Sequence, residues 1–166
     1  IAPKEMKRAK GNDPKNELKV FTANVLQENK AFHRIREQIS FLNPDVVFLV
    51  ETDKDWEQAM DEIIPDYPHC LKEPLDNTYG LLLYSRLPLK DGTVRYLAER
   101  EIPSVRFTAV LPSGAEVLFY GLHPKPPVPT ESLSSTAKDK ELMKVAFEIE
   151  KRSGPCVVMG DLNDVA

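Results

Sequence analysis

Residues 44–51 read Pro-Asp-Val-Val-Phe-Leu-Val-Glu, and this segment gives the clearest local indication of the fold class. A short, uninterrupted apolar run of this kind is typical of a strand that is buried on both faces, in a sheet covered by other layers. Pro44 ends whatever precedes the strand, since the residue before a proline disfavours helix. Glu51 then stands at the point where the strand ends.

Three other apolar runs end on polar side chains in the same way. Residues 18–23 lead to Asn24, residues 117–122 lead to His123, and residues 157–160 lead to Asp161 and Asn163. Buried strands bring their C-terminal ends together at one edge of a sheet, so distant residues can meet there. For any single member, the alternative is a polar residue that only begins a turn.

Helical periodicity alternates with these strands. The first predicted helix spans 29–43, with Asn29 as its cap and Pro44 after its end. A second follows Thr52 or Asp53 as the cap and ends at Pro65. A third spans 136–152, with Gly154 at its C-terminal cap. The apolar faces of the three helices consist of Phe32, Ile35, Ile39 and Leu42; Trp56, Met60, Ile63 and Ile64; and Leu142, Val145, Ala146 and Ile149.

The middle of the chain has the character of an antiparallel meander. We predict strands over 79–85, 94–98 and 104–111, with a tight turn at 112–115 before the strand that ends at His123. Together with the alternating strands and helices, this predicts an α/β (α+β) fold with mixed sheets. We place a polar N-terminal tail at 1–16 and one domain at 17–166.

Composition narrows the classes of partner. The formal net charge is −4 and the pI is about 5.5, which argues against a broad basic face that grips long nucleic acid. No apolar run is long enough to span a membrane, and no signal-peptide pattern is present. We therefore expect a soluble domain whose location is open. Because the chain begins with Ile1 and not Met, we also expect that something upstream was removed, either an initiator region, a leader or a membrane anchor, and an extracytoplasmic position behind such an anchor is one alternative. The basic stretch 4–10 is interpreted as a solvated tail or as a contact to an anionic surface.

The ordered set Asn24, Glu51, His123 and Gly-Asp-Leu-Asn-Asp (160–164), together with Gly-Leu-Leu-Leu-Tyr-Ser-Arg (80–86), resembles the endonuclease/exonuclease/phosphatase superfamily. These are DNase I-like, metal-dependent phosphoesterases, and the resemblance runs from about Leu18 to the last residue. It implies a four-layer sandwich of two mixed sheets flanked by helices. The overall pattern most resembles bacterial members.

The resemblance also implies roles for the residues at the strand ends. Glu51 and Asp161 would be the metal ligands, with Mg²⁺ or Mn²⁺ as the cofactor, because magnesium prefers oxygen ligands and needs few carboxylates. Asn24 and Asn163 would bind phosphate, and His123, Asp161 and Asn163 would be catalytic. Arg86 and Arg106 are weaker candidates for phosphate contacts. The substrate would be a phosphate ester, with nucleic acid and phospholipid head groups both open, and the oligomeric state is not indicated.

The family pattern continues beyond Gly-Asp-Leu-Asn to an Asp-His pair that this sequence does not contain. We therefore expect the chain to represent the N-terminal two-thirds of the domain, to lack its last strands and to be catalytically incomplete. The leading interpretation is a nuclease or phosphatase acting on phosphodiesters or phosphomonoesters. The alternatives are a non-enzymatic binding or interaction domain on a degenerate phosphoesterase fold, and an unrelated α/β domain.

Overall fold

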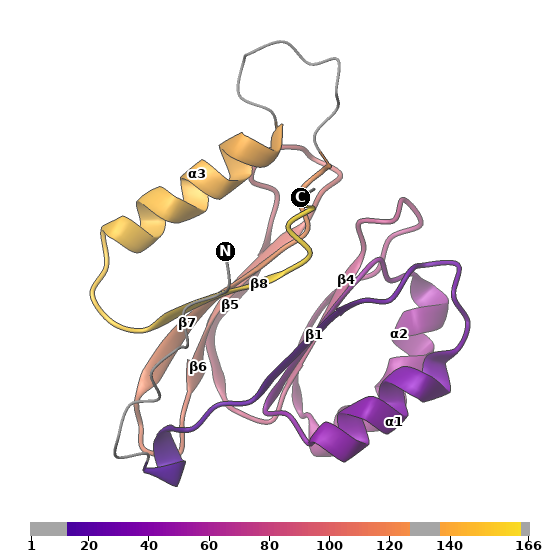
Figure 1. Cartoon of the computed structure of the whole chain (residues 1–166), viewed down its shortest axis with the longest axis horizontal. Helices are drawn as coiled ribbons and strands as arrows, with labels where there is room; N and C mark the ends of the chain where they lie inside the picture. The colour runs from indigo at the N-terminus through magenta and orange to yellow at the C-terminus, as the bar shows by residue number, and fades with distance from the viewer. Residues whose placement is uncertain (1–12, 127–136, 164–166) are drawn as a thin grey trace, which may run out of the picture.

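The apolar run after Pro44 forms the most deeply buried strand of the structure, β2 (Val46–Val50), whose five residues are all fully buried. The computed structural model describes residues 13–126 and 137–163 and arranges them in four layers (Figure 1). Helices α1 (Phe32–Leu42) and α2 (Lys54–Met60) cover a first sheet, a second sheet packs against its other face, and α3 (Ala137–Glu150) covers the outside. The four-layer sandwich predicted from the sequence is confirmed.

The first sheet has the strand order β1-β2-β4-β3. Its other strands are β1 (Val20–Asn24), β3 (His69–Glu73) and β4 (Leu81–Ser85). β1 and β2 are parallel, because α1 carries the chain back between them, whereas β4 is antiparallel to both of its neighbours. The sheet is therefore mixed, with β2 and β4 at its centre.

The second sheet has the strand order β5-β6-β7-β8. It contains β5 (Leu89–Arg95), β6 (Ser104–Val110), β7 (Glu116–Leu122) and β8 (Cys156–Gly160). The first three strands are antiparallel, as predicted for this part of the chain, but the strand predicted at 79–85 is β4 of the first sheet; β8 joins β7 in parallel after the crossover through α3. In the described part of the chain β8 is an outer strand, and its Val158 is 42% exposed.

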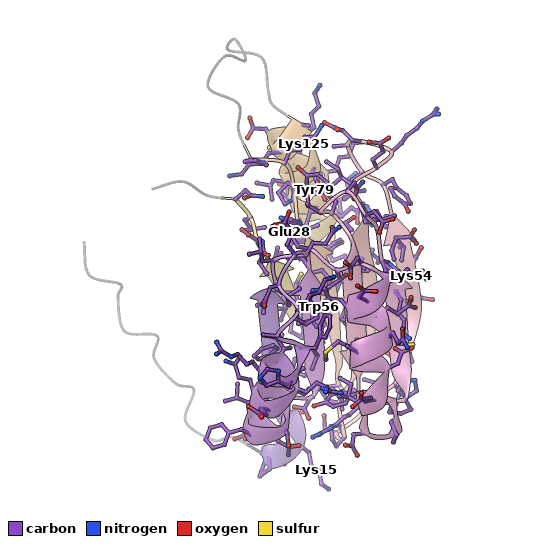
Figure 2. All side chains as sticks on the ribbon, turned by 90° about the vertical axis from the view of Figure 1, so that its right-hand side faces the viewer. Lys15, Glu28, Lys54, Trp56, Tyr79 and Lys125 are labelled. Atoms are coloured by element: carbon purple, nitrogen blue, oxygen red, sulfur yellow. The ribbon has the colours of Figure 1, made fainter. Side chains whose placement is uncertain are left out.

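The two faces of β2 supply two different cores, because successive side chains of a strand point to opposite faces. Val46, Phe48 and Val50 pack between the sheets, where Phe107 and Phe119 are stacked with ring centroids 4.8 Å apart. The alternate residues of β2 pack instead under α1 and α2 with Trp56 and Met60, a cluster that Figure 2 shows around the labelled Trp56. Burial on both sides is what the uninterrupted apolar run requires.

The helix ends agree with the predictions in part. The Asp53 carboxylate caps α2 by accepting from the Trp56 amide at 2.9 Å. Asn29 does not cap α1: its side chain accepts from the Ala31 amide, which closes a turn just before the helix starts at Phe32. The second helix does not run to Pro65, since α2 ends at Met60 and a 3₁₀ turn, η2 (Asp61–Asp66), contains the proline.

Other boundaries also differ from expectation. β3 was not predicted, because its sequence His-Cys-Leu-Lys-Glu shows no clean alternation of apolar and polar residues. β5 covers 89–95 instead of 94–98, and the turn at 112–115 forms as predicted, with Gly114 at φ +85°. Gly154 has a positive φ but lies beyond the last turn of α3, so it does not cap that helix.

Of the N-terminal tail predicted at 1–16, the structure describes residues 13–16. Part of the predicted tail forms a short 3₁₀ turn, η1 (Pro14–Asn16), and the Lys15 carbonyl accepts from the Ser113 amide at 3.3 Å. Residues 1–12, and with them the basic stretch, lie outside the described residues. Within the described ranges, no helix has the length and apolar character needed to cross a membrane.

Candidate functional site

The predicted site residues come together because two pairs of parallel strands end at the same edge. Asn24 ends β1 opposite Val50, and Glu51 follows immediately in the chain. In the second sheet Leu122 is opposite Gly160, so His123 and Asp161 leave their strands side by side. The sheets pack face to face, and the two pairs of strand ends therefore meet across the interface.

The side-chain amide of Asn24 joins the two sheets. Its Nδ2 donates to Glu51 Oε1 at 2.6 Å and to Asp161 Oδ2 at 2.9 Å. Its Oδ1 accepts from the Leu26 amide at 3.0 Å, which fixes the orientation of the group. Since a primary amide has two N–H donors, both are engaged by carboxylates in this arrangement.

His123 is a buried neighbour of these two carboxylates. Its side chain is 4% exposed, and its Nε2 is 3.9 Å from Glu51 Oε1. Burial lowers the pKa of His123, while the nearby Asp161 and Glu51 carboxylates oppose that shift. The imidazole is therefore neutral at pH 7, and its buried Nδ1 has no hydrogen-bond partner among the described residues.

Asp161 and Asn163 form a tight turn after β8. The Asn163 amide donates to Asp161 Oδ1 at 3.0 Å, and its side-chain Nδ2 donates to the Pro124 carbonyl at 2.8 Å, next to His123. The hydrogen bond from Asn24 is the main reason that the pKa of Asp161 is lowered, and the Asn163 amide adds to the effect. Asp161 is accordingly ionised at neutral pH.

Unusual backbone conformations accumulate at this edge. Glu51 has φ +62° and Asn163 has φ +49°, conformations that cost non-glycine residues about 1–3 kcal/mol each. Gly160 has φ +126°, and a Cβ atom there would lie 1.9 Å from the Leu122 carbonyl oxygen. The packing of the strand ends thus maintains a strained geometry that presents Glu51 and Asp161 toward each other.

Two neighbours of the site were not singled out from the sequence. The Tyr79 ring lies against His123, with centroids 5.3 Å apart, and Figure 2 shows Tyr79 at the same end of the molecule as Glu28 and Lys125. Lys138 donates from Nζ to the Asn163 carbonyl at 3.1 Å. The feature of the sequence that could have pointed to Tyr79 is the glycine that follows it. A Cβ atom at Gly80 would lie 1.8 Å from the Thr52 carbonyl oxygen, so the loop that carries Tyr79 must pack closely on the turn after β2.

The two arginines considered for phosphate contacts are elsewhere. Arg106 lies 3.8 Å from a carboxylate oxygen of Glu148, beneath α3. Arg86 follows β4 at the opposite end of the first sheet, since Ser85 is paired with Val46 at the start of β2. Arg86 is at that end because β4 runs antiparallel to β2, a pairing that the sequence alone does not reveal.

The donor set fits a hard divalent cation. Glu51 and Asp161 share one amide, and neither has a Lys or Arg partner at ion-pair distance in the described part of the chain. Two converging carboxylates without a cationic partner leave negative charge uncompensated, and a metal ion would offset it. The described residues contain no group of three or more His, Cys, Asp or Glu side chains around one point, but Mg²⁺ keeps several waters and needs only one or two carboxylates.

Comparisons with solved structures place this geometry among known folds. TDP2 of D. rerio, solved as a complex with a single-strand DNA product, has a TM-score of 0.73 and 17% identity over 90% of this chain and 62% of that one. The human nocturnin catalytic domain, solved with a bound sulfate anion, has a TM-score of 0.68 and 19% identity over 89% and 65%. An endonuclease/exonuclease/phosphatase from Beutenbergia cavernae has a TM-score of 0.67 and 19% identity over 88% and 47%.

The chain thus spans less than two-thirds of the length of these structures, and no curated protein matches its sequence significantly. The likeness to the solved structures establishes the fold. The sequence itself shows more than the fold. The family pattern aligns with residues 21–166, which include every strand end that contributes to the site. On this match the chain belongs to the endonuclease/exonuclease/phosphatase family.

Proposed function

We propose that this edge is a metal-dependent phosphoesterase site that hydrolyses a phosphodiester or phosphomonoester. One observation carries the proposal: the Asn24 amide holds Glu51 and Asp161 together from two different sheets, beside a neutral His123. Membership of the family supports chemistry on phosphate esters. The absence of a cationic partner for either carboxylate in the described chain supports dependence on a divalent metal.

Glu51 is the proposed principal ligand of Mg²⁺ or Mn²⁺, and Asp161 is the second. When bound, the ion neutralises charge that develops on the phosphoryl oxygens. The left-handed backbone at Glu51 turns its carboxylate toward Asp161, so the chain holds both groups in place before the cation arrives. Preorganisation of this kind lowers the cost of binding.

The remaining residues would act on the phosphate group. Asn24 has both N–H donors engaged by the carboxylates, so contact with a phosphate requires that one carboxylate turn away from it. Asn163 would donate from its side chain to a non-bridging oxygen, which stabilises charge that builds up in the transition state. His123 is neutral, so its imidazole can donate one hydrogen bond to a phosphate oxygen or accept a proton there.

The substrate proposal follows the solved neighbours and the charge balance. TDP2 of D. rerio was solved with a single-strand DNA product and nocturnin with sulfate, which favours a phosphate ester and includes single-stranded nucleic acid. The net charge of −4 argues against a long duplex held by a basic face. A phospholipid head group is the second substrate class, since it presents the same phosphodiester.

We also propose that residues 1–166 bind metal but hydrolyse slowly. Among the described residues His123 is the one histidine at this edge, because His33 lies in α1 and His69 lies in β3 beside Ser85, at the far end of the sheet. The Asp-His pair that the family resemblance leads us to expect does not occur in residues 1–166, so His123 alone is present to move a proton at this edge. Loss of one member of a cooperating set typically costs several orders of magnitude in turnover.

The test combines calorimetry with turnover. Mn²⁺ binding should be measurable for the wild type, lost in Glu51→Gln and retained in the matched variant Glu28→Gln, whose exposed carboxylate lies at the same end of the molecule. Hydrolysis of bis-p-nitrophenyl phosphate should be far slower for residues 1–166 than for a form extended by a further Asp-His segment. Metal binding that survives Glu51→Gln would refute the ligand assignment, and equal turnover of the two forms would refute the proposed incompleteness.

A further inference from the structure

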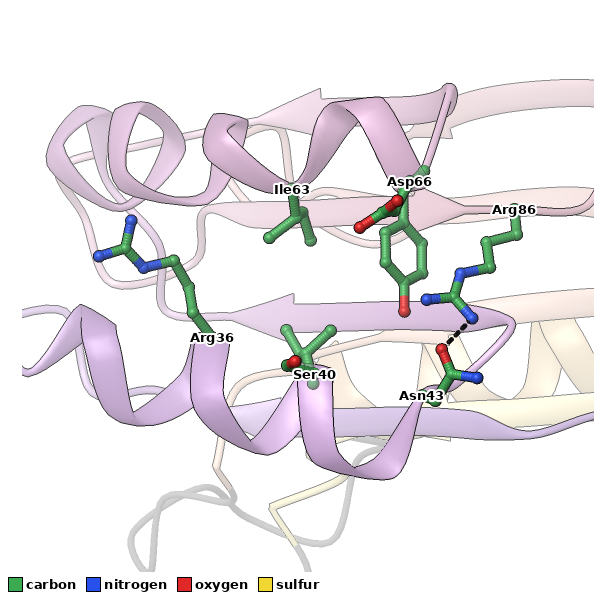
Figure 3. A pocket seen from close by; sticks show the side chains of 8 residues that line it. Arg36, Ser40, Asn43, Ile63, Asp66 and Arg86 are labelled. Carbon is green, nitrogen blue, oxygen red and sulfur yellow. Dashed lines mark hydrogen bonds between the residues drawn. The ribbon is translucent and has the colours of Figure 1, made fainter.

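A cavity of about 290 Å³ lies between α1 and η2, away from the strand ends described above. It is lined by Arg36, Ile39, Ser40, Asn43, Ile63, Asp66, Tyr67 and Arg86 (Figure 3). Asn43 and Arg86 flank the start of β2, whereas Glu51 follows its end. At about 3.3 Å per residue the two places are roughly 16 Å apart along the strand, so this cavity is separate from the candidate phosphoesterase site.

Arg86 is held in position without a carboxylate partner. Its guanidinium lies over the Tyr67 ring, 4.5 Å from the centroid, and donates to the Asn43 side-chain oxygen. Both supports are themselves fixed: the Tyr67 hydroxyl donates to the Pro44 carbonyl at 2.8 Å, and Asn43 is the left-handed residue that ends α1. No Asp or Glu of the described chain lies at ion-pair distance from Arg86, so several of its five N–H donors remain available.

The exposed residue Asp66 also lines this cavity, and its carboxylate has no cationic partner among the described residues. Figure 3 shows Asp66 and Arg86 at the same end of the cavity, yet the two do not form an ion pair within the described chain. Arg36, in contrast, is paired with Glu62 and is therefore already compensated. The Arg86 guanidinium and the Asp66 carboxylate thus line the same cavity without forming an ion pair, because Tyr67 and Asn43 hold the guanidinium.

Beside the charged groups the cavity offers apolar and hydroxyl surface. Ile39 is 2% exposed and Ile63 is half-buried, and both line the cavity together with Ser40. Figure 3 shows Ile63 on the η2 side facing Ser40 on the α1 side. Figure 3 shows Asp66 and Arg86 at the same end of the cavity, so an occupant that satisfies all of these groups has its anionic and cationic groups close together and a short apolar part.

We propose that this cavity binds a small zwitterion of the α-amino acid class. Its carboxylate would accept two N–H groups from Arg86, the bidentate geometry that a guanidinium favours. Its ammonium would face Asp66, and its apolar side chain would pack on Ile39 and Ile63. The volume of about 290 Å³ is at the lower end of ligand pockets, which suits a molecule of this size.

The test is a titration of the ¹⁵N-labelled protein by NMR with three probes that share the isobutyl group of leucine. L-Leucine carries both charges, 4-methylpentanoate carries only the carboxylate, and isopentylamine carries only the ammonium. We expect saturable shifts around the cavity with leucine, with a Kd of about 1 mM, and at least tenfold weaker binding of each single-charge probe. Binding of 4-methylpentanoate as tightly as leucine, or no saturable shift with leucine, would overturn the proposal.

Variants separate the cavity from general surface effects. Arg86→Gln and Asp66→Asn should each weaken leucine at least tenfold, whereas Arg34→Gln and Asp76→Asn, on exposed residues elsewhere, should not change its affinity. Because Arg86 also supports Asn43 and Tyr67, Ser40→Leu provides a second test that leaves both charges in place. It fills the cavity from an exposed helical position and should abolish the shifts; retained binding in Ser40→Leu would contradict the assignment.

Discussion

At the scale of the residue, Asn24 matters most for the candidate site. One side-chain nitrogen contacts carboxylates from both sheets, and the Glu51–His123 distance of 3.9 Å extends the cluster to an imidazole. Two carboxylates at such close range repel each other unless donors or cations lie between them. Asn24 provides those donors, and it thereby keeps Asp161 ionised.

Replacement of Asn24 by Ala should raise the pKa of Asp161. The hydrogen bond from Asn24 is the first cause of the lowered value, and its loss also leaves Glu51 and Asp161 to repel each other. Titration of the Asp161 carboxyl carbon by ¹³C NMR measures the change. Asn77→Ala, which removes an amide bonded to the Glu101 carbonyl, should leave the Asp161 titration unchanged. An unchanged value in Asn24→Ala would show that the amide does not stabilise the charged form.

At the scale of the element, α3 carries a titratable group inside its packing face. Glu141 is 2% exposed, and its Oε1 has no hydrogen-bond partner in the described chain. Burial raises the pKa of Glu141 to about 7, although Arg95 and Lys144 partly offset the effect. The folded protein therefore binds a proton here in a pH range where the unfolded chain has already lost it.

This difference makes the stability of the α3 layer depend on pH. Below the unfolded pKa of 4.5, Glu141 is protonated in both the folded and the unfolded protein, and the stability that its protonated form gives is fully present. This stability is lost as the pH rises through the folded pKa of about 7, and the free energy of unfolding falls by about 3 kcal/mol. Glu141→Gln keeps the shape of the side chain without its charge and should remove this decline. Urea unfolding at pH 5, 6, 7 and 8 measures it.

Glu150→Gln is the matched control, since Glu150 is exposed on the same helix. Its unfolding should follow the pH dependence of the wild type. If Glu141→Gln declines with pH as steeply as the wild type, the buried carboxyl is not the cause.

At the scale of the whole molecule, one core holds the two sheets in register with each other. Phe107 and Phe119 belong to the second sheet and pack in the same buried cluster as Phe48 of the first. The Asn24–Asp161 hydrogen bond crosses from one sheet to the other, so the site depends on the separation that this core sets. Gly121 allows the close approach, because a Cβ there would lie 2.7 Å from the Phe48 ring.

Phe119→Ala should destabilise the protein by about 3–5 kcal/mol, because it removes a fully buried ring and leaves a cavity between the sheets. Guanidinium unfolding measures the loss. Phe41→Ala, at a residue that is 87% exposed, should change the free energy of unfolding by no more than about 0.5 kcal/mol. Equal effects of the two substitutions would mean that the sheets do not share one core.

Several parts of this architecture could be predicted because they are encoded over short distances. The apolar run 46–50 specifies a strand buried on both faces, and Asp53 specifies the start of α2 through a hydrogen bond only three residues along the chain. The polar residues at four strand ends were likewise visible, since each directly follows an apolar run. The roles proposed for Asn24, Glu51, His123, Asp161 and Asn163 stay predictions.

Other features follow only from the tertiary structure. β3 has no clear periodicity and becomes a strand because β4 offers it an open edge. Tyr79 meets His123 through packing, and Arg86 lies at the far end of the sheet because β4 pairs with β2 in antiparallel; local sequence specifies neither. The contact between Asn24 and Asp161 joins residues 137 positions apart. The sequence by itself determined which groups stand at the strand ends, because periodicity and turn chemistry act locally. The tertiary structure decided which of them touch, because those distances depend on how two separately formed sheets pack.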